Sequence, residues 1–183
     1  MQTRHKPRQL LVKVRDWRAT RGRLVYGALD LPCALGRTGI VVRKREGDGA
    51  TPVGIFPIRI GFYRPDKIRK PASSLSMAAL CLTDGWCDAP DDRNYNRAVD
   101  LPYPASAETM WRADHLYDIG LIPEHNHSPR IRGGGSAIFV HLATPNFSAT
   151  EGCVALQRQD MLKLLGVIRP GDELVIGCHR IKS

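Results

Sequence analysis

The stretch Ala137-Ile-Phe-Val-His-Leu-Ala143, followed by Ser148-Ala-Thr-Glu-Gly-Cys-Val-Ala-Leu156, determines which fold and chemistry this sequence predicts. The first run is apolar except for His141, which indicates a buried strand that carries one imidazole. In the second run Cys153 directly follows Gly152. A glycine turn can direct the sulfur outward while its backbone N–H groups face a developing oxyanion, and the imidazole can take the thiol proton. The layout predicts a cysteine nucleophile with a histidine base, and hence acyl transfer.

A structural interpretation of the same residues stays open. A cysteine chosen at random is more often a buried small hydrophobic side chain, and a lone histidine on an apolar strand is more often a core residue with its hydrogen bonds satisfied. The glycine turn favours the nucleophile instead. In that interpretation Gly152 allows a positive φ or a close backbone approach, and Thr150 braces the turn. Glu151 either orients an acceptor ammonium group or is a solvated loop charge.

Three segments together resemble the L,D-transpeptidase (YkuD-like) catalytic domain. The Thr150-x-Gly152-Cys153 turn, which follows a strand ending in Val140-His141, is similar to the catalytic turn of that family. Residues 45–57 contain Thr51-Pro-Val-Gly-Ile-Phe56 and are similar to the family's upstream hairpin, and residues 133–141 are similar to the strand that leads to its histidine. The segments lie within residues 40–177, which is most of the chain.

The resemblance implies a mainly β fold with a few helices (α+β), a YkuD-like β-sandwich of mixed sheets. It also implies that Cys153 forms a thioester with a peptidoglycan stem peptide, which an amine or water then resolves, and that carbapenem-type β-lactams acylate the same thiol. No cofactor is implied, and the expected location is the cell envelope or periplasm. The sequence departs from the usual pattern at Glu151, where histidine is frequent, at Ala155, where arginine is frequent, and in a shorter loop between histidine and cysteine.

Length and composition indicate one domain. The 183 residues, of which 43% are hydrophobic, suit a single core. We expect a basic tail at residues 1–9 and one catalytic domain at residues 10–183. No apolar run is long enough to span a membrane, and Leu10-Leu-Val12 is too short for the apolar segment of a signal peptide, so the chain shows no export signal.

The chain is basic, with a net charge of +9 and a pI near 9.7. Such a charge favours polyanions in general. The basic clusters Arg4-His-Lys-Pro-Arg8 and Arg43-Lys-Arg45 contain no aromatic residues and match no groove-reading motif, so sequence-specific nucleic-acid binding is not expected. An anionic cell-wall polymer or an ordinary solvated surface fits the charge equally well.

The number of cysteines is odd, so at least one thiol is free, and we expect that one to be Cys153. No CxxC pair suggests a zinc ribbon, and a bridge between Cys81 and Cys87 remains open. The other members of the set are Cys33 and Cys178.

Short apolar runs between turn signals predict strands near residues 10–14, 23–26, 28–32, 40–44, 54–60 and 173–176. The turn at residues 47–52 predicts a hairpin between the fourth and fifth of these. Residues 84–103 read as a long polar loop. Ser106 is a potential cap for a helix at 107–112, and the spacing of Met161, Leu164, Leu165 and Ile168 predicts a second helix at 157–165. Its nearby N-terminus is expected to lower the pKa of Cys153 below the usual ~8.5.

Further residues belong to alternatives from other classes. His125, His127 and His141 would serve a zinc-dependent peptidoglycan hydrolase, although no HExxH-type spacing supports a metal. Otherwise Asn126, His127 and Trp86 are candidates for lining the substrate cleft. A catalytically inert cell-wall-binding module is the third alternative, and the retained thiol turn argues against it.

Overall fold

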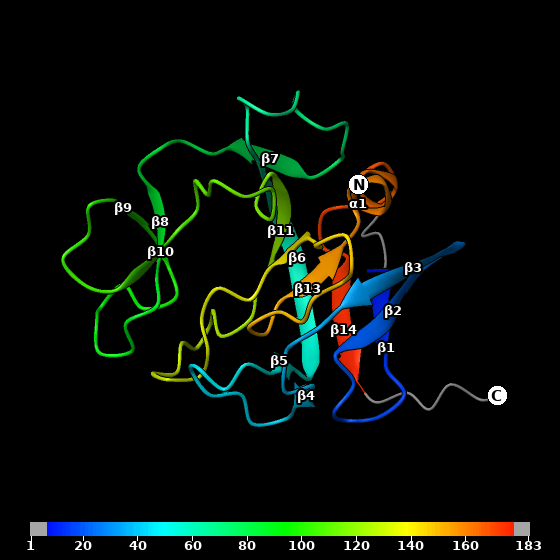
Figure 1. Ribbon diagram of the computed structural model, residues 1–183, viewed down its shortest axis with the longest axis horizontal. Helices are drawn as coiled ribbons and strands as arrows, with labels where there is room; N and C mark the ends of the chain where they lie inside the picture. Colours follow the sequence, from blue (N-terminus) through cyan, green and yellow to red (C-terminus); the bar gives the residue numbers. More distant parts are fainter. Residues whose placement is uncertain (1–6, 178–183) are drawn as a thin grey trace, which may run out of the picture.

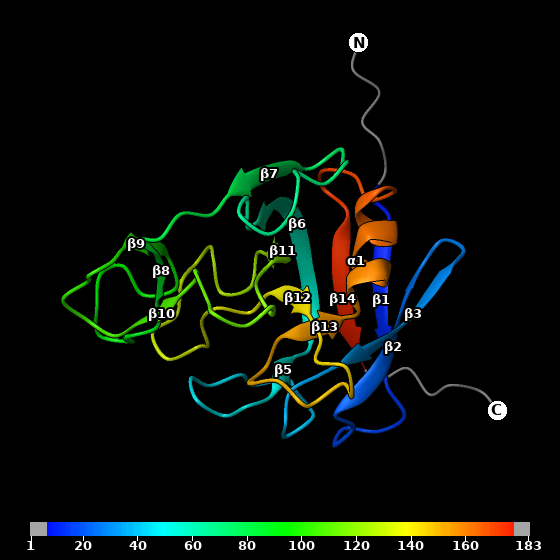
Figure 2. The same ribbon diagram turned by 45° about the horizontal axis from the view of Figure 1, so that its top comes forward.

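Strands dominate residues 7–177, the part of the chain that the computed structural model describes, and the predicted mainly β fold is confirmed. A single helix lies among these residues, and Figures 1 and 2 show it beside the main sheet. The elements are β1 Gln9–Lys13, β2 Arg21–Tyr26, β3 Leu29–Ala34, β4 Ile40–Val41, β5 Thr51–Pro52, β6 Gly54–Tyr63, β7 Ser76–Ala79, β8 Asp84–Cys87, β9 Ala98–Asp100, β10 Ala107–Thr109, β11 Ile119–Pro123, β12 Val140–Leu142, β13 Val154–Leu156, α1 Arg158–Leu165 and β14 Glu173–Gly177.

The main sheet has nine strands in the order β11-β12-β13-β3-β2-β1-β14-β6-β7. It is mixed, because β1–β14, β12–β13 and β6–β7 are parallel while the other neighbours are antiparallel. The long strand β6 also pairs with β11, so the sheet closes on itself. Buried side chains of strands throughout this sheet pack together with those of α1 and form the main core.

Alternating side chains explain the pairing of the first and last strands. In β1, Leu10 and Val12 are fully buried, and in β14 the buried positions are Leu174 and Ile176. The register places Leu10 opposite Leu174 and Val12 opposite Ile176, so the apolar residues of both strands lie on one face. A slip by one residue would expose all four, which fixes the register.

Helix α1 confirms the predicted helix near residues 157–165. Its Met161, Leu164 and Leu165 are buried, as is Ile168 beyond its end, and Gly166 is the C-terminal cap. Spacing of three and four residues places these side chains on one face, where they join the main core.

Two expectations from the sequence about residues 84–112 are wrong. Residues 107–109 form strand β10 rather than a helix, because Glu108 pairs with Trp86 of β8 and a six-residue helix gains little by itself. The polar loop at residues 84–103 contains β8 and β9, which with β10 make a small antiparallel sheet (Figure 1). In both segments, pairing with strands elsewhere in the sequence determines the secondary structure.

The expected hairpin between residues 40–44 and 54–60 is also absent from the described chain. Strand β4 ends at Val41 and pairs in parallel with β5, through bonds from Thr51 N–H to Gly39 O (2.9 Å) and from Val53 N–H to Val41 O (2.8 Å). The loop between them folds around Asp48, whose carboxylate accepts the N–H groups of Arg45 and Ala50.

The expected tail at residues 1–9 lies largely outside the described residues, as does Cys178. Gln9 already belongs to β1, and Arg8 N–H donates to Asp172 Oδ1 at 2.9 Å. Among residues 7–177, no helix is long and apolar enough to cross a membrane.

Asp172 joins three parts of the main sheet, and its removal should destabilise the fold. Its buried carboxylate accepts the backbone N–H groups of Arg8 and Arg169, each at 2.9 Å, and the hydroxyl of Tyr26. Burial opposes ionisation, but these hydrogen bonds outweigh it and lower the pKa of Asp172. We expect Asp172→Ala to reduce the free energy of unfolding by about 2–4 kcal/mol in urea denaturation at neutral pH.

The pH dependence gives this prediction a second measurement. Because the pKa of Asp172 is lower in the folded state, its stabilisation is present above the unfolded pKa of about 4 and is lost as the pH falls further. The difference between the wild type and Asp172→Ala should therefore shrink in acid. The exposed Asp30, paired with Arg23 at 2.8 Å, is the matched control, and Asp30→Ala should cost at most about 1 kcal/mol.

Candidate active site

Parallel strands β12 and β13 place the predicted nucleophile and base on one face of the sheet. The register pairs His141 with Ala155, and Cys153 lies two residues before Ala155, on the same side of its strand. Both Cys153 and His141 line a cavity of about 540 Å³. Ala155 also lines it and forms a small buried cluster with Ala34 and Ala143.

The thiol of Cys153 is buried and held by two backbone groups. It donates to Ala137 O at 3.2 Å and accepts the N–H of Phe139 at 3.3 Å. Burial raises the pKa of Cys153 to about 12, although the Phe139 N–H favours the thiolate. The expectation of a lowered pKa is wrong, because β13 separates the residue from α1 and burial outweighs any effect of the helix. The resting group is a neutral thiol.

His141 is also neutral at rest, and its tautomer follows from one contact. Nδ1 lies 2.8 Å from Leu142 O, and because a carbonyl only accepts, Nδ1 carries the proton and Nε2 carries a lone pair. Burial lowers the pKa of His141 to about 4, although the Leu142 carbonyl opposes this. The ring of Tyr117 packs edge-on at 5.3 Å. Among the described residues no hydrogen bond joins the imidazole to the thiol.

Two threonine hydroxyls and one glycine shape the turn before the thiol. Thr150 Oγ1 donates to Cys153 O at 2.7 Å and accepts the N–H of Gly152 at 3.1 Å. The buried Thr51 Oγ1 accepts the N–H of Gly36 at 2.8 Å and lies 3.5 Å from the same carbonyl. Gly152 has φ +132°, and a Cβ there would lie 2.7 Å from Ala50 O. The position therefore needs glycine.

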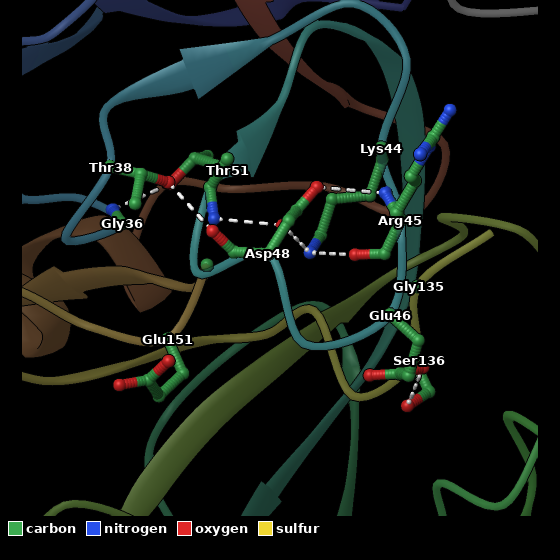
Figure 3. A network of polar contacts seen from close by, with 12 residues as sticks. Gly36, Thr38, Lys44, Arg45, Glu46, Asp48, Thr51, Gly135, Ser136 and Glu151 are labelled. Atoms are coloured by element: carbon green, nitrogen blue, oxygen red, sulfur yellow. Dashed lines mark hydrogen bonds and ion pairs between the residues drawn. The ribbon is translucent and has the colours of Figure 1, made fainter. Parts of the chain in front are cut away.

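The loop at residues 44–51 packs against this turn, because Ala50 O lies close to Gly152. Figure 3 shows the polar contacts within the loop. Asp48 organises the loop: its side chain contacts Lys44 Nζ, and its carbonyl accepts the hydroxyl of Thr38 at 2.8 Å. Glu46 reaches toward the cavity and accepts the hydroxyl of Ser136 at 2.8 Å. The Thr-Pro-x-Gly segment, which begins at Thr51, contacts the turn before the thiol through the Thr51 hydroxyl.

Carboxylates outnumber cations in the wall of the Cys153 cavity, although the chain as a whole is basic. The acidic residues are Glu46, Asp88, Glu108 and Glu151, and the one arginine among the lining residues is Arg112. Glu151 lies at the exposed rim and pairs with Arg37 at 2.9 Å. The other three carboxylates give the interior of the cavity a negative character.

Glu108 links the small sheet to the predicted base. It accepts the hydroxyl of Tyr117 at 2.6 Å and lies 3.6 Å from Arg112, while burial raises its pKa. Because Tyr117 packs against His141, this carboxylate is connected to the imidazole through the side chain of Tyr117.

Three of the predicted substrate-binding residues do not line the Cys153 cavity. Trp86 and His127 line a second cavity of about 300 Å³, together with Phe139. The amide of Asn126 is occupied in its own loop, where it donates to Ile131 O (2.9 Å) and Gly135 O (3.0 Å). Thr150 and Glu151 do line the Cys153 cavity.

The three histidines of the zinc alternative are not gathered into one set. His141 lines the Cys153 cavity, His127 lines the second one, and His125 Nε2 lies 3.0 Å from Gly134 O. Among residues 7–177, no three His, Cys, Asp or Glu side chains are placed to hold a metal ion. In the same part of the chain Cys81 and Cys87 are both free, so they form no bridge.

Sequence reasoning missed several cavity residues. Glu108 was assigned to a helix, and Asp88 to a polar loop, so neither could be placed near the thiol. Only contacts between distant segments bring them there, and no local pattern marks them. The missed residues of the cavity wall include Glu46, Asp88, Glu108, Arg112, Tyr117, Ser136 and Ala137.

Comparison with known proteins identifies the family of this chain. The family model described as the L,D-transpeptidase catalytic domain (YkuD) matches residues 6–176. The chain therefore belongs to the L,D-transpeptidase catalytic-domain family, as the resemblance of its motifs predicted. Among solved structures, an L,D-transpeptidase from Mycobacterium smegmatis is similar at 14% identity and a TM-score of 0.41, over 92% of this chain and 58% of that one. A search of curated proteins finds no significant match.

Proposed function

We propose that this protein is a cysteine acyltransferase that cross-links or trims peptidoglycan stem peptides through a thioester on Cys153. The observation that carries the proposal is the placement, in one cavity, of a neutral imidazole on β12 and a thiol directly before the adjacent parallel strand β13. Membership in the family supplies the class of substrate. Both an amine and water are acceptors in this proposal, so transpeptidation is accompanied by some carboxypeptidase activity.

The reaction begins with two neutral groups. As Cys153 Sγ attacks the donor carbonyl, Nε2 of His141 takes the thiol proton, and the backbone N–H of Cys153 with a neighbouring donor stabilises the oxyanion. The tetrahedral intermediate then collapses, the C–N bond breaks, and the imidazolium returns the proton to the departing amine. A thioester remains. An acceptor amine attacks it, His141 removes a proton from that amine, and the thiol is released with the new amide.

The acidic cavity wall suits a cationic acceptor. An amine reaches the site mainly as ammonium, and the carboxylates of Glu46, Asp88 and Glu108 attract it in surroundings of low dielectric constant. Glu151 at the rim, already paired with Arg37, contributes less. This arrangement supports a diamino-acid side chain as the acceptor.

Mass spectrometry of the intact protein tests the proposal. Incubation with stem peptides should add to Cys153 the mass of the donor peptide less its leaving group. Added amine should hasten the loss of this adduct. A carbapenem should acylate the same thiol in a one-to-one ratio, because its strained amide presents an equivalent carbonyl. With the thiol shown to be reduced, absence of both adducts would contradict the proposal.

The same experiment separates the alternatives. A chelator should leave the rate of acylation unchanged, whereas inhibition that zinc reverses would favour a metal-dependent hydrolase. An inert wall-binding module would bind peptidoglycan without any covalent adduct. With this activity, the protein is expected to act in the cell envelope, where its proposed peptidoglycan substrate lies.

A further inference from the structure

Asn96 connects the small sheet to the segments that surround the thiol. It is buried, and its side-chain amide makes four hydrogen bonds, two donated and two accepted, which is its full capacity. Nδ2 donates to the carbonyls of His125 and Asn126, each at 3.0 Å. Oδ1 accepts Trp86 Nε1–H at 2.9 Å and the backbone N–H of Ala137 at 3.2 Å. Since all four partners have fixed roles, the orientation of the amide is determined.

The bond to Ala137 leads directly to the thiol. Ala137 has φ +50°, a left-handed conformation that is unfavourable for alanine and persists only where the surroundings impose it. Its N–H is held by Asn96, while its carbonyl accepts the thiol of Cys153. The angles φ and ψ together set the direction of the carbonyl relative to the N–H, so a residue held in this unusual conformation presents its carbonyl in a defined direction. A change at Asn96 therefore alters the group that orients the sulfur.

We infer that Asn96 is a positioning residue for the acyl-transfer site, because its amide fixes Ala137 and thereby directs the Cys153 sulfur into the cavity. The inference deepens the proposed function, on which its acylation measurements rest. This inference also gives the small sheet a role, since β8 and β9 flank Asn96 and hold it beside the loop before β12. Asn96 does not touch the substrate in this proposal and acts through Ala137.

Asn96→Ala is the first test, with Asn94→Ala as its control. Asn94 lies in the same connection between β8 and β9, but its side chain donates to the hydroxyl of Tyr103, and no hydrogen bond among residues 7–177 connects it to Ala137. We expect Asn96→Ala to slow acylation of Cys153 by about 10- to 100-fold with little change in KM, because misplacing a reacting group lowers the rate more than the affinity. Asn94→Ala should retain the wild-type rate.

Alkylation by iodoacetamide, mapped to each cysteine by mass spectrometry, provides a readout that needs no donor peptide. In Asn96→Ala the freed thiol becomes more exposed, so labelling of Cys153 should rise several-fold. Cys87 of β8 is fully buried and reports on the small sheet itself. It should stay protected. Labelling of Cys87 together with Cys153 would show that Asn96 only stabilises the sheet and would overturn the positioning role.

Asn96→Asp adds a test that remains available if the alanine variant fails to fold. The carboxylate keeps an acceptor for Ala137 but turns its second oxygen toward the carbonyls of His125 and Asn126. Protonation restores one donor, so acylation relative to the wild type should improve as the pH falls from about 8 to about 5. A ratio independent of pH would contradict the inference. If the wild type itself is not acylated, the proposed function fails, while the alkylation pattern still decides the role of Asn96.

Discussion

Cys153→Ala is expected to abolish acyl transfer while the protein stays folded. Without the sulfur no thioester can form, and removal of a nucleophile lowers turnover by about 10⁴-fold or more. The cost in stability should be about 1–3 kcal/mol, since the alanine leaves two backbone groups, Phe139 N–H and Ala137 O, without their partner. Mass spectrometry should show no adduct with stem peptide or carbapenem, and the circular dichroism spectrum should match that of the wild type.

The remaining cysteines are the controls for this variant. Cys33, Cys81 and Cys87 lie outside the Cys153 cavity, and each alanine variant should keep its acylation rate. Cys178 lies beyond the described residues, and its alanine variant is expected to behave in the same way. An unfolded Cys153→Ala protein together with an active Cys153→Ser protein would show that the residue serves packing. Loss of acylation in one of the other variants, at unchanged stability, would transfer the nucleophile to that position.

His141→Ala should slow acylation by about 10²- to 10⁴-fold and should change its pH dependence. In the wild type the pKa of His141 is lowered to about 4, so the base is neutral and the rate should be nearly level above about pH 5. Without the imidazole only the thiolate reacts. Because burial raises the pKa of Cys153 to about 12, the rate should climb about tenfold per pH unit throughout the range in which the protein is folded. Acylation measured by mass from pH 6 to 9 gives both profiles.

His127→Ala and His125→Ala are the controls for the role of the base. Neither residue lines the Cys153 cavity, so both variants should show the level wild-type profile. His125→Ala also loses the contact with Gly134 O and should be somewhat less stable. If His127→Ala instead shows the large loss that alkali restores, while His141→Ala acylates normally, the base has been misassigned.

Local patterns in the sequence were sufficient for part of the fold. Short apolar runs between turn signals predicted β1 and β14, and spacing of three and four residues predicted α1, because both signals depend on neighbours in the chain. The same local logic failed at residues 107–112. There the helical pattern was short, and the pairing of Glu108 with Trp86 determined the strand. The prediction of a hairpin at residues 40–60 was wrong for a similar reason. Strand β4 pairs with β5, and β6 pairs with β14, β11 and β7.

By itself the sequence determined the candidate chemistry of this protein, a thiol after a glycine turn and an imidazole on the preceding strand, because the turn and the strand are local features. Tertiary structure alone decided the surroundings of that pair. Burial made both groups neutral, and distant segments supplied the carboxylates of the cavity wall and the Asn96 amide. Trp86 and His127 were placed in a second cavity by the same long-range packing. Desolvation and contacts between remote residues depend on the closed sheet, which no short stretch of sequence encodes.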